Sequence, residues 1–231
     1  EINAMNMSVE SAEKGGYEYF MAKEIYEQPK AVRDTVSPLI KNGKIQLPVE
    51  FPENFIKNLK RIYIVACGSA YHVGMTAKYI IEDLARIPVT VDIASEFRYR
   101  NPIIEKGDLC IFVSQSGETA DTLASLREAK TRGAFILSIV NVLYSTIARE
   151  SDGVIYTNAG AEIAVATTKA FSAQLGVSYI LASYLAYEKG LIDEKYIKNF
   201  TDEILSIPEK IKDALGNDKI TDKLAKLIST K

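Results

Sequence analysis

Five short apolar runs, separated by segments with a helical pattern, constrain the fold of this chain more than any other feature of its sequence. They lie at residues 61–66, 89–94, 109–113, 135–140 and 153–157. The first, RIYIVA, is nearly continuous in apolar and β-branched residues, which is typical of a strand buried on both faces. The last, GVIYT, is shorter and more polar, which indicates an edge strand. Strands that alternate with helices predict βαβ units, a parallel sheet and right-handed crossovers.

Helical patterns fill the intervals and both flanks of these runs. Between the strands the apolar spacing predicts helices over 70–86, 119–132 and 145–150. Ahead of the strands, residues 17–40 have a helical period, but Pro29 indicates two helices, the second with Pro29 in its first turn. Asn42-Gly43 is expected to end that segment. Behind the strands, helices are predicted over 170–188, 193–206, 209–215 and 218–229, with a break before Pro208.

These elements predict an α/β protein with a three-layer αβα sandwich, a five-stranded parallel sheet, flanking N-terminal helices and a helical C-terminal tail. A chain of 231 residues can bury a sizeable core, so its stability requires neither a metal nor a disulfide. Residues 1–16 are polar and contain the Gly15-Gly16 break, and we interpret them as a linker or an artificial end of the chain. Residues 17–190 are expected to form the domain with its N-terminal helices, and residues 191–231 the helical tail.

Composition and charge narrow the possible partners. Hydrophobic residues make up 47% and charged residues 25% of the chain, as in an ordinary globular protein, which excludes wholesale disorder. The 28 Lys and Arg against 30 Asp and Glu give a net charge of −2, which favours neither a nucleic acid nor a membrane as partner. No run of ~18 apolar residues is present, and the polar N-terminus lacks a signal-peptide core. Cys67 and Cys110 lie inside apolar runs, which favours buried thiols in a reducing cytoplasm over a disulfide.

A polar turn, SQSGET, follows the third predicted strand. Ligands of open parallel sheets bind at the carboxyl ends of strands. Hydroxyl and amide donors here join the unpaired N–H groups and the positive end of a helix, and they come from Ser114, Gln115, Ser116 and Thr119. Such neutral donors predict phosphate binding, although neither GxxxxGK nor GxGxxG is present. The alternative is a simple helix cap, but a cap needs one hydroxyl and this turn offers three.

Two further connections are candidates for the same site. The turn after the first strand is either an anion or substrate site or an ordinary tight turn, and consists of Cys67, Gly68 and Ser69. The connection at 161–169 contains small residues that let a ligand approach the backbone, and is otherwise a loop that ends in a threonine cap. Its central residues are Val165, Ala166 and Thr167.

Other reactive side chains are better explained by structural roles. His72 is the only histidine, and because one histidine cannot supply a metal site we expect it to be packed or solvated. Cys67 has no evident His–Asp partners, which favours a structural thiol over a nucleophile. Glu118 and Glu162 are possible bases near a sugar, but a glutamate at a helix start is favoured by the helix dipole in any case. We therefore expect no metal.

Six segments together resemble a known family. They are KEIYEQP at 23–29, ACGSAYHVGM at 66–75, ASEFRYR at 94–100, SQSGETADTL at 114–123, RESD at 149–152 and VATTKAF at 165–171. The three turns resemble a sugar isomerase (SIS) domain, a sugar-phosphate-binding module with a flavodoxin-like fold. The order of the segments resembles the first of the two SIS modules in the glucosamine-6-phosphate synthase family, over roughly residues 17–190.

The resemblance implies a role for each candidate residue. The family's SQSGET turn holds the phosphate of fructose 6-phosphate, so the implied phosphate ligands are Ser114, Gln115, Ser116 and Thr119. Further contacts are implied for Cys67, Gly68 and Ser69, although Ala70 stands where the family often has serine. The loop that lines the sugar is matched by Val165, Ala166 and Thr167. The family's catalytic glutamate, lysine and histidine lie in the second module or its tail, so the resemblance implies no catalytic residue and no cofactor in this chain.

The resemblance also implies an activity and partners. The family converts fructose 6-phosphate and glutamine to glucosamine 6-phosphate and glutamate, and has a glutaminase domain ahead of its two SIS modules. Since this chain starts at Glu1 and ends at Lys231, we expect it to bind a hexose 6-phosphate but to be inactive without those parts. SIS modules usually pair, and the N-terminal helices and the tail offer apolar faces, so we expect a homodimer; the two cysteines favour the cytoplasm. Two alternatives stay open: a stand-alone regulatory SIS protein that binds a sugar phosphate, and a tandem-SIS sugar-amine deglycase.

Overall fold

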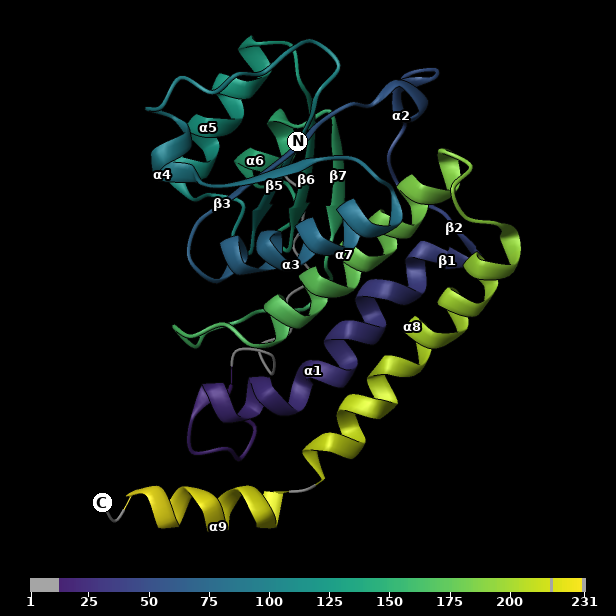
Figure 1. Ribbon diagram of the computed structural model, residues 1–231. Helices are drawn as coiled ribbons and strands as arrows, with labels where there is room; N and C mark the ends of the chain where they lie inside the picture. The colour runs from purple at the N-terminus through teal and green to yellow at the C-terminus, as the bar shows by residue number, and fades with distance from the viewer. Residues whose placement is uncertain (1–12, 217, 230–231) are drawn as a thin grey trace.

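A five-stranded parallel sheet forms the centre of the molecule. The computed structural model describes residues 13–216 and 218–229, so most of the predicted linker at 1–16 lies outside the described residues. The strand order is β4-β3-β5-β6-β7, and all neighbours are parallel (Figure 1). The strands are β3 (Ile62–Ala66), β4 (Val89–Ile93), β5 (Leu109–Ser114), β6 (Phe135–Val140) and β7 (Gly153–Tyr156). Each lies within one residue of its predicted bounds, and β7 is an edge strand, as predicted.

Helices cover both faces of this sheet, which confirms the three-layer αβα sandwich. One face carries α1 (Phe20–Val36), α3 (Ser69–Leu84) and α7 (Lys169–Glu188), and the other carries α4 (Ala94–Phe97), α5 (Ala120–Thr131) and α6 (Thr146–Glu150) (Figure 1). Successive residues of a strand point to opposite faces, so β3 contributes to two cores. Ile62 and Ile64 face the first group of helices, and Tyr63 and Val65 face the second. The short α4 was not predicted.

The N-terminal segment forms one continuous helix, α1, and the prediction of two helices was wrong. Pro29 lies inside α1 and has no N–H with which to reach the carbonyl of Ile25 one turn earlier. The side chain of Gln28 replaces that bond, because its Nε2 donates to the Ile25 carbonyl at 3.1 Å. Ser172 of α7 in turn donates its hydroxyl to Gln28 Oε1 at 2.6 Å. A neighbouring side chain therefore compensates for the proline.

A small hairpin follows α1. Asn42 and Gly43, which were expected only to end the helical segment, have positive φ values of 53° and 69°. Two consecutive positive φ values are what a two-residue hairpin turn of type I′ requires. The short elements of this region are η2 (Ser37–Leu39), β1 (Ile40–Lys41), β2 (Lys44–Ile45) and α2 (Phe55–Asn58).

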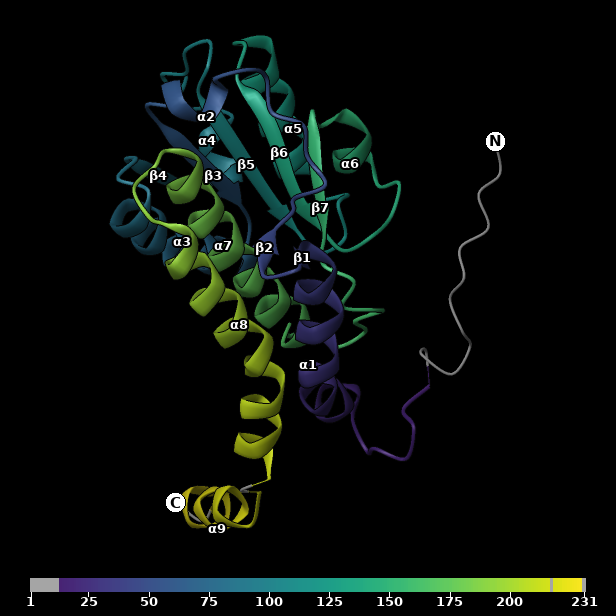
Figure 2. The same cartoon turned by 90° about the vertical axis from the view of Figure 1, so that its right-hand side faces the viewer.

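The C-terminal tail also carries a proline inside a continuous helix. The predicted break before Pro208 is wrong, because α8 (Glu194–Leu215) continues through it. Pro208 and Ile204 are buried, and α8 lies beside α1 in both views (Figures 1 and 2). Burial of this apolar face offsets the ~3 kcal/mol that an interior proline costs a helix. The last described helix, α9 (Asp218–Ser229), has its predicted bounds.

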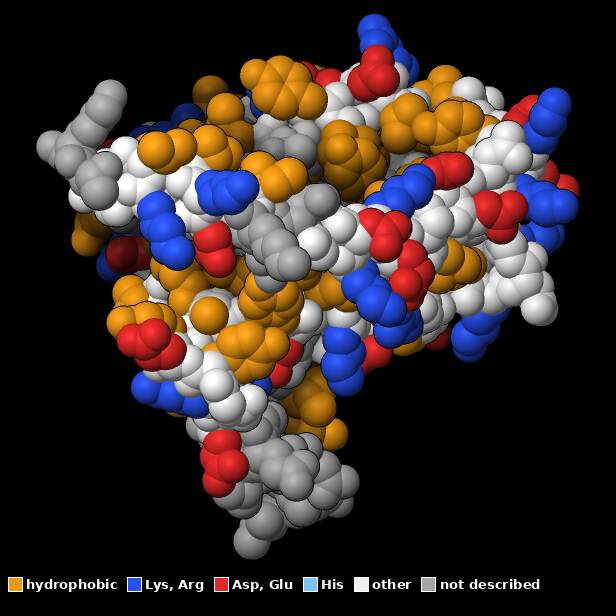
Figure 3. All heavy atoms as spheres, turned by 90° about the horizontal axis from the view of Figure 1, so that it is seen from below, with side chains coloured by type: hydrophobic (Ala, Val, Ile, Leu, Met, Phe, Trp, Pro, Cys, Tyr) orange, Lys and Arg blue, Asp and Glu red, His pale blue; other side chains and the backbone are white. Residues whose placement is uncertain are grey.

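The described surface carries charges of both signs. On the face seen from below Figure 1, Lys and Arg side chains are interspersed with Asp and Glu, and apolar side chains gather in patches between them (Figure 3). This face therefore has no extended region of purely positive or purely negative charge. Across residues 13–216 and 218–229, every helix is too short or too polar to cross a bilayer.

Candidate functional site

The strand order points to a ligand site at the carboxyl ends of β3 and β5. From β3 the chain passes to β4 on one side, then crosses back to β5 on the other side of β3, so the order reverses between β3 and β5. Open parallel sheets bind ligands at such a reversal. The register pairs Ala66, the last residue of β3, with Val113 of β5. The turns after these two strands therefore begin side by side at one edge of the sheet.

A cavity of about 270 Å³ lies between these two turns and the start of α7. Eight of the ten residues predicted from the sequence line it: Cys67, Ser69, Ser114, Gln115, Ser116, Thr119, Val165 and Thr167. The other two, Gly68 and Ala166, sit between lining residues without forming part of the wall. The fold thus brings three turns that are distant in the sequence to one cavity.

The turn after β5 is held by its own hydroxyl groups. The N–H of Gly117 donates to Ser114 Oγ at 3.0 Å, and Ser114 Oγ lies 3.3 Å from Thr119 Oγ1. The N–H of Glu118 donates to Ser116 Oγ at 3.2 Å. A hydroxyl oxygen that accepts one bond keeps its own proton to donate. The hydroxyl groups of Ser114 and Ser116 therefore shape the turn and can still act as donors.

Gly117 is required by the geometry of this turn. Its φ of 65° lies in the left-handed region, and a Cβ built there would lie 2.0 Å from the Oγ and 2.5 Å from the Cβ of Ser145. The N–H of Ile147 in α6 donates to the Gly117 carbonyl at 3.0 Å. The turn therefore packs directly against the start of α6, at a distance that only glycine permits.

Glu118 has a structural role, as the sequence favoured. Its Oε1 accepts the backbone N–H of Thr146 at 2.7 Å, at the start of α6. This backbone hydrogen bond is the main cause that lowers the pKa of the Glu118 carboxyl. A carboxylate at a helix N-terminus satisfies an N–H that has no partner within the helix. Glu118 thus caps α6 and is oriented toward that helix.

The turn after β3 leaves its backbone accessible. Gly68 precedes α3 with φ of 58° and ψ of −134°, and no atom lies within 4 Å of a Cβ built on it. The N–H of Tyr71 in α3 donates to the Gly68 carbonyl at 3.1 Å. The two N–H groups ahead of it, at the start of α3, have no partner within the helix and are available at this end of the cavity. Cys67 is half-buried, and its Sγ accepts a weak bond from Thr122 Oγ1 at 3.8 Å. Both cysteines are free thiols, and burial raises the pKa of the Cys110 thiol.

Glu162 holds the connection at 161–169, between β7 and α7. Its Oε1 accepts the N–H groups of Thr168 at 2.9 Å and Ala170 at 3.3 Å, at the start of α7. Its Oε2 accepts the Thr167 hydroxyl at 2.5 Å. Glu162 therefore caps α7, which is the structural role that the sequence favoured, and the Thr167 hydroxyl is already engaged. The side chain of Val165, in contrast, is fully exposed beside the cavity.

Comparison with known proteins agrees with this geometry. The SIS domain family matches residues 55–184, which is more than half of the chain and includes all five strands of the central sheet. The chain belongs to the SIS domain family. The cavity described above therefore lies at the strand ends of an SIS domain.

Relatives with high sequence identity extend beyond this SIS domain. The glutamine–fructose-6-phosphate aminotransferase [isomerizing] of Clostridium tetani is 54% identical over 227 residues, which cover 97% of this chain and 37% of that protein. The C-terminal domain of glucosamine-fructose-6-phosphate aminotransferase from Francisella tularensis is 42% identical with a TM-score of 0.88, over 95% of this chain and 62% of that chain. A glucosamine-6-phosphate deaminase from Thermotoga maritima is 25% identical with a TM-score of 0.62, over 83% of this chain and 54% of that chain. The chain thus spans 37% of the length of the Clostridium relative.

The wall of the cavity at the ends of β3 and β5 contains three residues outside the predicted set of ligands: Ala70, Val113 and Gln174. The sequence analysis named Ala70 only as the position where the family often has serine. Val113 directly precedes the predicted Ser114 and could have been found by extending that turn by one position. Gln174 lies inside α7 and not in a strand-to-helix connection. The sequence placed it on a predicted helix but did not indicate that it lines the cavity. His72 is exposed, and the described residues include no group of three or more His, Cys, Asp or Glu side chains placed to hold a metal.

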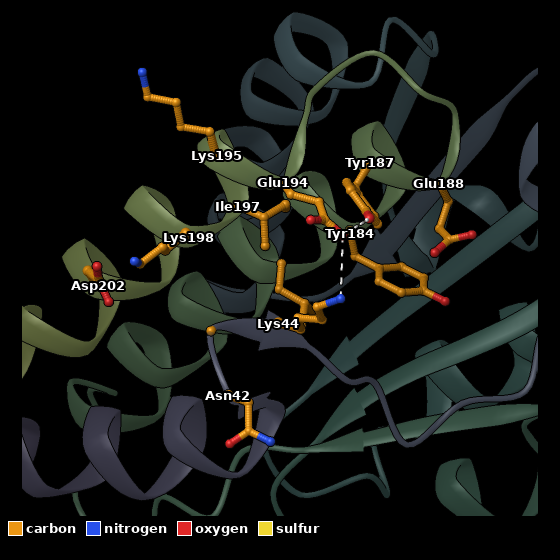
Figure 4. Close-up of a pocket in the computed structure, with 12 residues that line it drawn as sticks. Asn42, Lys44, Tyr184, Tyr187, Glu188, Glu194, Lys195, Ile197, Lys198 and Asp202 are labelled. Atoms are coloured by element: carbon orange, nitrogen blue, oxygen red, sulfur yellow. Dashed lines mark hydrogen bonds and ion pairs between the residues drawn. The ribbon is translucent and has the colours of Figure 1, made fainter.

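A second hollow of about 580 Å³ lies away from the strand ends, between the β1–β2 hairpin, the end of α7 and the start of α8 (Figure 4). Lys44 pairs with Glu194 at 3.4 Å, and the Tyr187 hydroxyl also donates to Glu194 at 3.4 Å. Lys195 and Lys198 point away from that pair (Figure 4). The charged groups of this hollow neutralise each other or point apart, so they do not converge on one point. In the cavity at the ends of β3 and β5, by contrast, hydroxyl and amide groups line a common wall.

Proposed function

We propose that this chain is the first SIS module of a glutamine–fructose-6-phosphate aminotransferase, and that its cavity binds a hexose 6-phosphate. The observation that carries this proposal is the turn after β5. Its four predicted phosphate ligands line one wall of the cavity directly ahead of α5: Ser114, Gln115, Ser116 and Thr119. A phosphate there would meet hydroxyl and amide donors together with the positive end of the α5 dipole.

The other two connections would hold the rest of the ligand. We assign the open backbone after β3 to further contacts with the sugar phosphate, through Cys67, Gly68 and Ser69. We assign the segment before α7 to the sugar, through Val165, Ala166 and Thr167. No Lys or Arg is among the residues of the described cavity wall, so binding rests on neutral donors and we expect an affinity in the millimolar range.

The parent activity requires groups from outside this wall. Moving a proton between C1 and C2 of a sugar needs a positioned acid or base. The residues that line the described cavity include no Asp, Glu, His or Lys, while Glu118 and Glu162 are engaged as helix caps. We therefore propose that a second SIS module supplies the catalytic groups, that a glutaminase domain supplies ammonia, and that this chain alone catalyses nothing.

The same proposal covers organisation and location. Residues 17–190 form the SIS domain with its N-terminal helices, residues 191–231 form a tail, and two copies form a homodimer. An apolar groove of about 920 Å³ between α3, α7 and α8 supports association, because it exposes Tyr79, Tyr179 and Ile207. Two free thiols support a reducing, cytoplasmic environment.

Calorimetry with fructose 6-phosphate and glucosamine 6-phosphate tests the proposal. We expect the 231-residue chain to bind at least one of them at millimolar concentration and not to bind unphosphorylated fructose. Ser116→Ala removes one donor from the turn and should weaken binding about fivefold to tenfold, as the loss of one hydrogen bond does. If neither phosphorylated sugar binds while the fold is intact, the assignment of the cavity is wrong.

A further inference from the structure

Gln174 is a buried amide for which the proposed site has no use so far. It is 2% exposed and lines the cavity from the second turn of α7. Besides the backbone hydrogen bonds of the helix, the main-chain carbonyl of Gln174 accepts the Ser178 hydroxyl at 2.9 Å. Within the described part of the chain, neither the nitrogen nor the oxygen of its side-chain amide has a partner.

Gln174 shares the cavity wall with apolar as well as polar residues. The wall residues Ala70 and Val113 have apolar side chains, and the adjacent Ala173 on α7 is completely buried. The amide of Gln174 is not among the described side-chain atoms that are fully buried without a partner, so it keeps contact with the open cavity. An amide at a cavity wall without a protein partner can donate and accept hydrogen bonds with a ligand there. The partner of this amide is therefore expected on the cavity side, from water in the free chain and from a ligand when one is bound.

We propose that Gln174 binds a hydroxyl group of the sugar and so makes the cavity prefer a phosphorylated sugar over phosphate alone, an inference that rests on the proposed function. A side-chain amide offers two donors and one acceptor without a charge. A sugar hydroxyl both donates and accepts, and therefore matches it, whereas inorganic phosphate held by the turn after β5 brings no sugar hydroxyl to this wall. Sites built to hydrogen-bond a hydroxyl discriminate strongly against ligands that lack it, since the buried polar group is then left unpaired.

The test compares two ligands on two leucine variants of the full 231-residue chain. Fructose 6-phosphate and inorganic phosphate are titrated separately, and the amide signals of Gly117 and Glu118 are followed by NMR. Gln174→Leu should weaken fructose 6-phosphate about tenfold and leave inorganic phosphate unchanged. Gln115→Leu, the matched control on the phosphate wall, should weaken both ligands.

Thermal unfolding separates this role from a structural one. Leucine is similar in size to glutamine and needs no hydrogen bond, so Gln174→Leu should unfold at the same or a higher temperature while it binds the sugar less well. Gln174→Met, which keeps the unbranched shape, is the second variant if leucine prevents folding. The proposal is overturned if the variant binds fructose 6-phosphate as tightly as the original chain, or if it loses affinity for both ligands equally. If the original chain binds neither ligand, the proposed function itself fails.

Discussion

Single residues set the shape of the turn that we assign to phosphate. Gly117 packs on Ser145 at the start of α6, and Glu118 closes the same contact by accepting the N–H of Thr146. One side of the turn is therefore held against α6, while the hydroxyl groups on its other side line the cavity. The consequence is that changes on the α6 side of the turn should reach the site without touching a ligand.

Gly117→Ala should destabilise the protein by about 3 kcal/mol or more, because strain and overpacking add. Gly43→Ala is a matched control: its φ of 69° is close to the 65° of Gly117, but nothing lies within 4 Å of the added Cβ. That control should cost only the left-handed strain, about 1–2 kcal/mol. Urea unfolding of both variants measures the difference. Equal losses would show that contact with Ser145 contributes nothing.

The Glu118 carboxyl predicts a pH dependence of stability. Its pKa in the folded chain is lowered, chiefly by the backbone N–H of Thr146, so its charge stabilises the fold above the unfolded pKa of about 4.3. That contribution is lost as the pH falls through the lowered pKa. Glu118→Gln keeps an acceptor oxygen but removes the charge. Unfolding experiments should therefore find the two chains different at neutral pH and converging as the pH falls through the lowered pKa of Glu118. A difference that does not change with pH contradicts this.

Much of the site could be predicted at this scale because its chemistry is local. Ser114, Gln115, Ser116 and Thr119 are adjacent in the sequence, and one strand end brings all of them to the cavity. Gln174 could not be found in the same way. Nothing in the sequence around it indicates which side of α7 faces the cavity, and only the packing of α7 against the sheet decides that.

At the scale of elements, α1 braces the connection that we assign to the sugar. Glu24 is 2% exposed, and its Oε1 accepts the N–H groups of Ile163 at 2.6 Å and Ala164 at 3.1 Å. One turn further along, Glu27 Oε2 lies 2.6 Å from the Nζ of Lys169, which is 4% exposed at the start of α7. The segment KEIYEQP thus has a structural explanation: Glu24 holds the loop at 158–168, and Glu27 holds the start of α7.

Glu24→Ala should loosen that loop. The two N–H groups would lose their acceptor, which costs about 1–3 kcal/mol of stability when such groups stay buried. Hydrogen exchange should show faster exchange at Ile163 and Ala164, with little change in β5. Glu18→Ala, an exposed carboxylate close before α1, is the control and should leave exchange in the loop unaltered. Unchanged protection in Glu24→Ala would contradict the brace.

Helices and strands could be predicted where their own residues contain the pattern that identifies them. The strands were found because runs such as IYIVA are buried on both faces and need no polar alternation. The two proline breaks were misjudged for the opposite reason. At Pro29 the side chain of Gln28 replaces the missing bond, and at Pro208 packing against α1 keeps α8 continuous. Rules for proline describe an isolated helix and do not include such compensation.

At the scale of the whole molecule, the apolar groove between α3, α7 and α8 predicts association. Sedimentation equilibrium at micromolar concentration should give a mass of about twice 25.6 kDa. Replacing Tyr179, which is 42% exposed in the groove, with Glu should shift the chain toward the single-copy mass without loss of secondary structure. A single-copy mass for the unaltered chain would rule out the homodimer.

The central claim concerns the place of ligand binding, and an NMR titration with fructose 6-phosphate tests it most directly. The strand order puts the site between the turns after β3 and β5, so the amide signals of Ser69, Ser116, Gly117 and Thr119 should shift together and saturate. Signals of Lys44 and Lys195, at the hollow between the hairpin and α8, should stay in place. Shifts confined to that second hollow, or an absence of shifts at Ser116–Thr119 in the folded chain, would contradict the account.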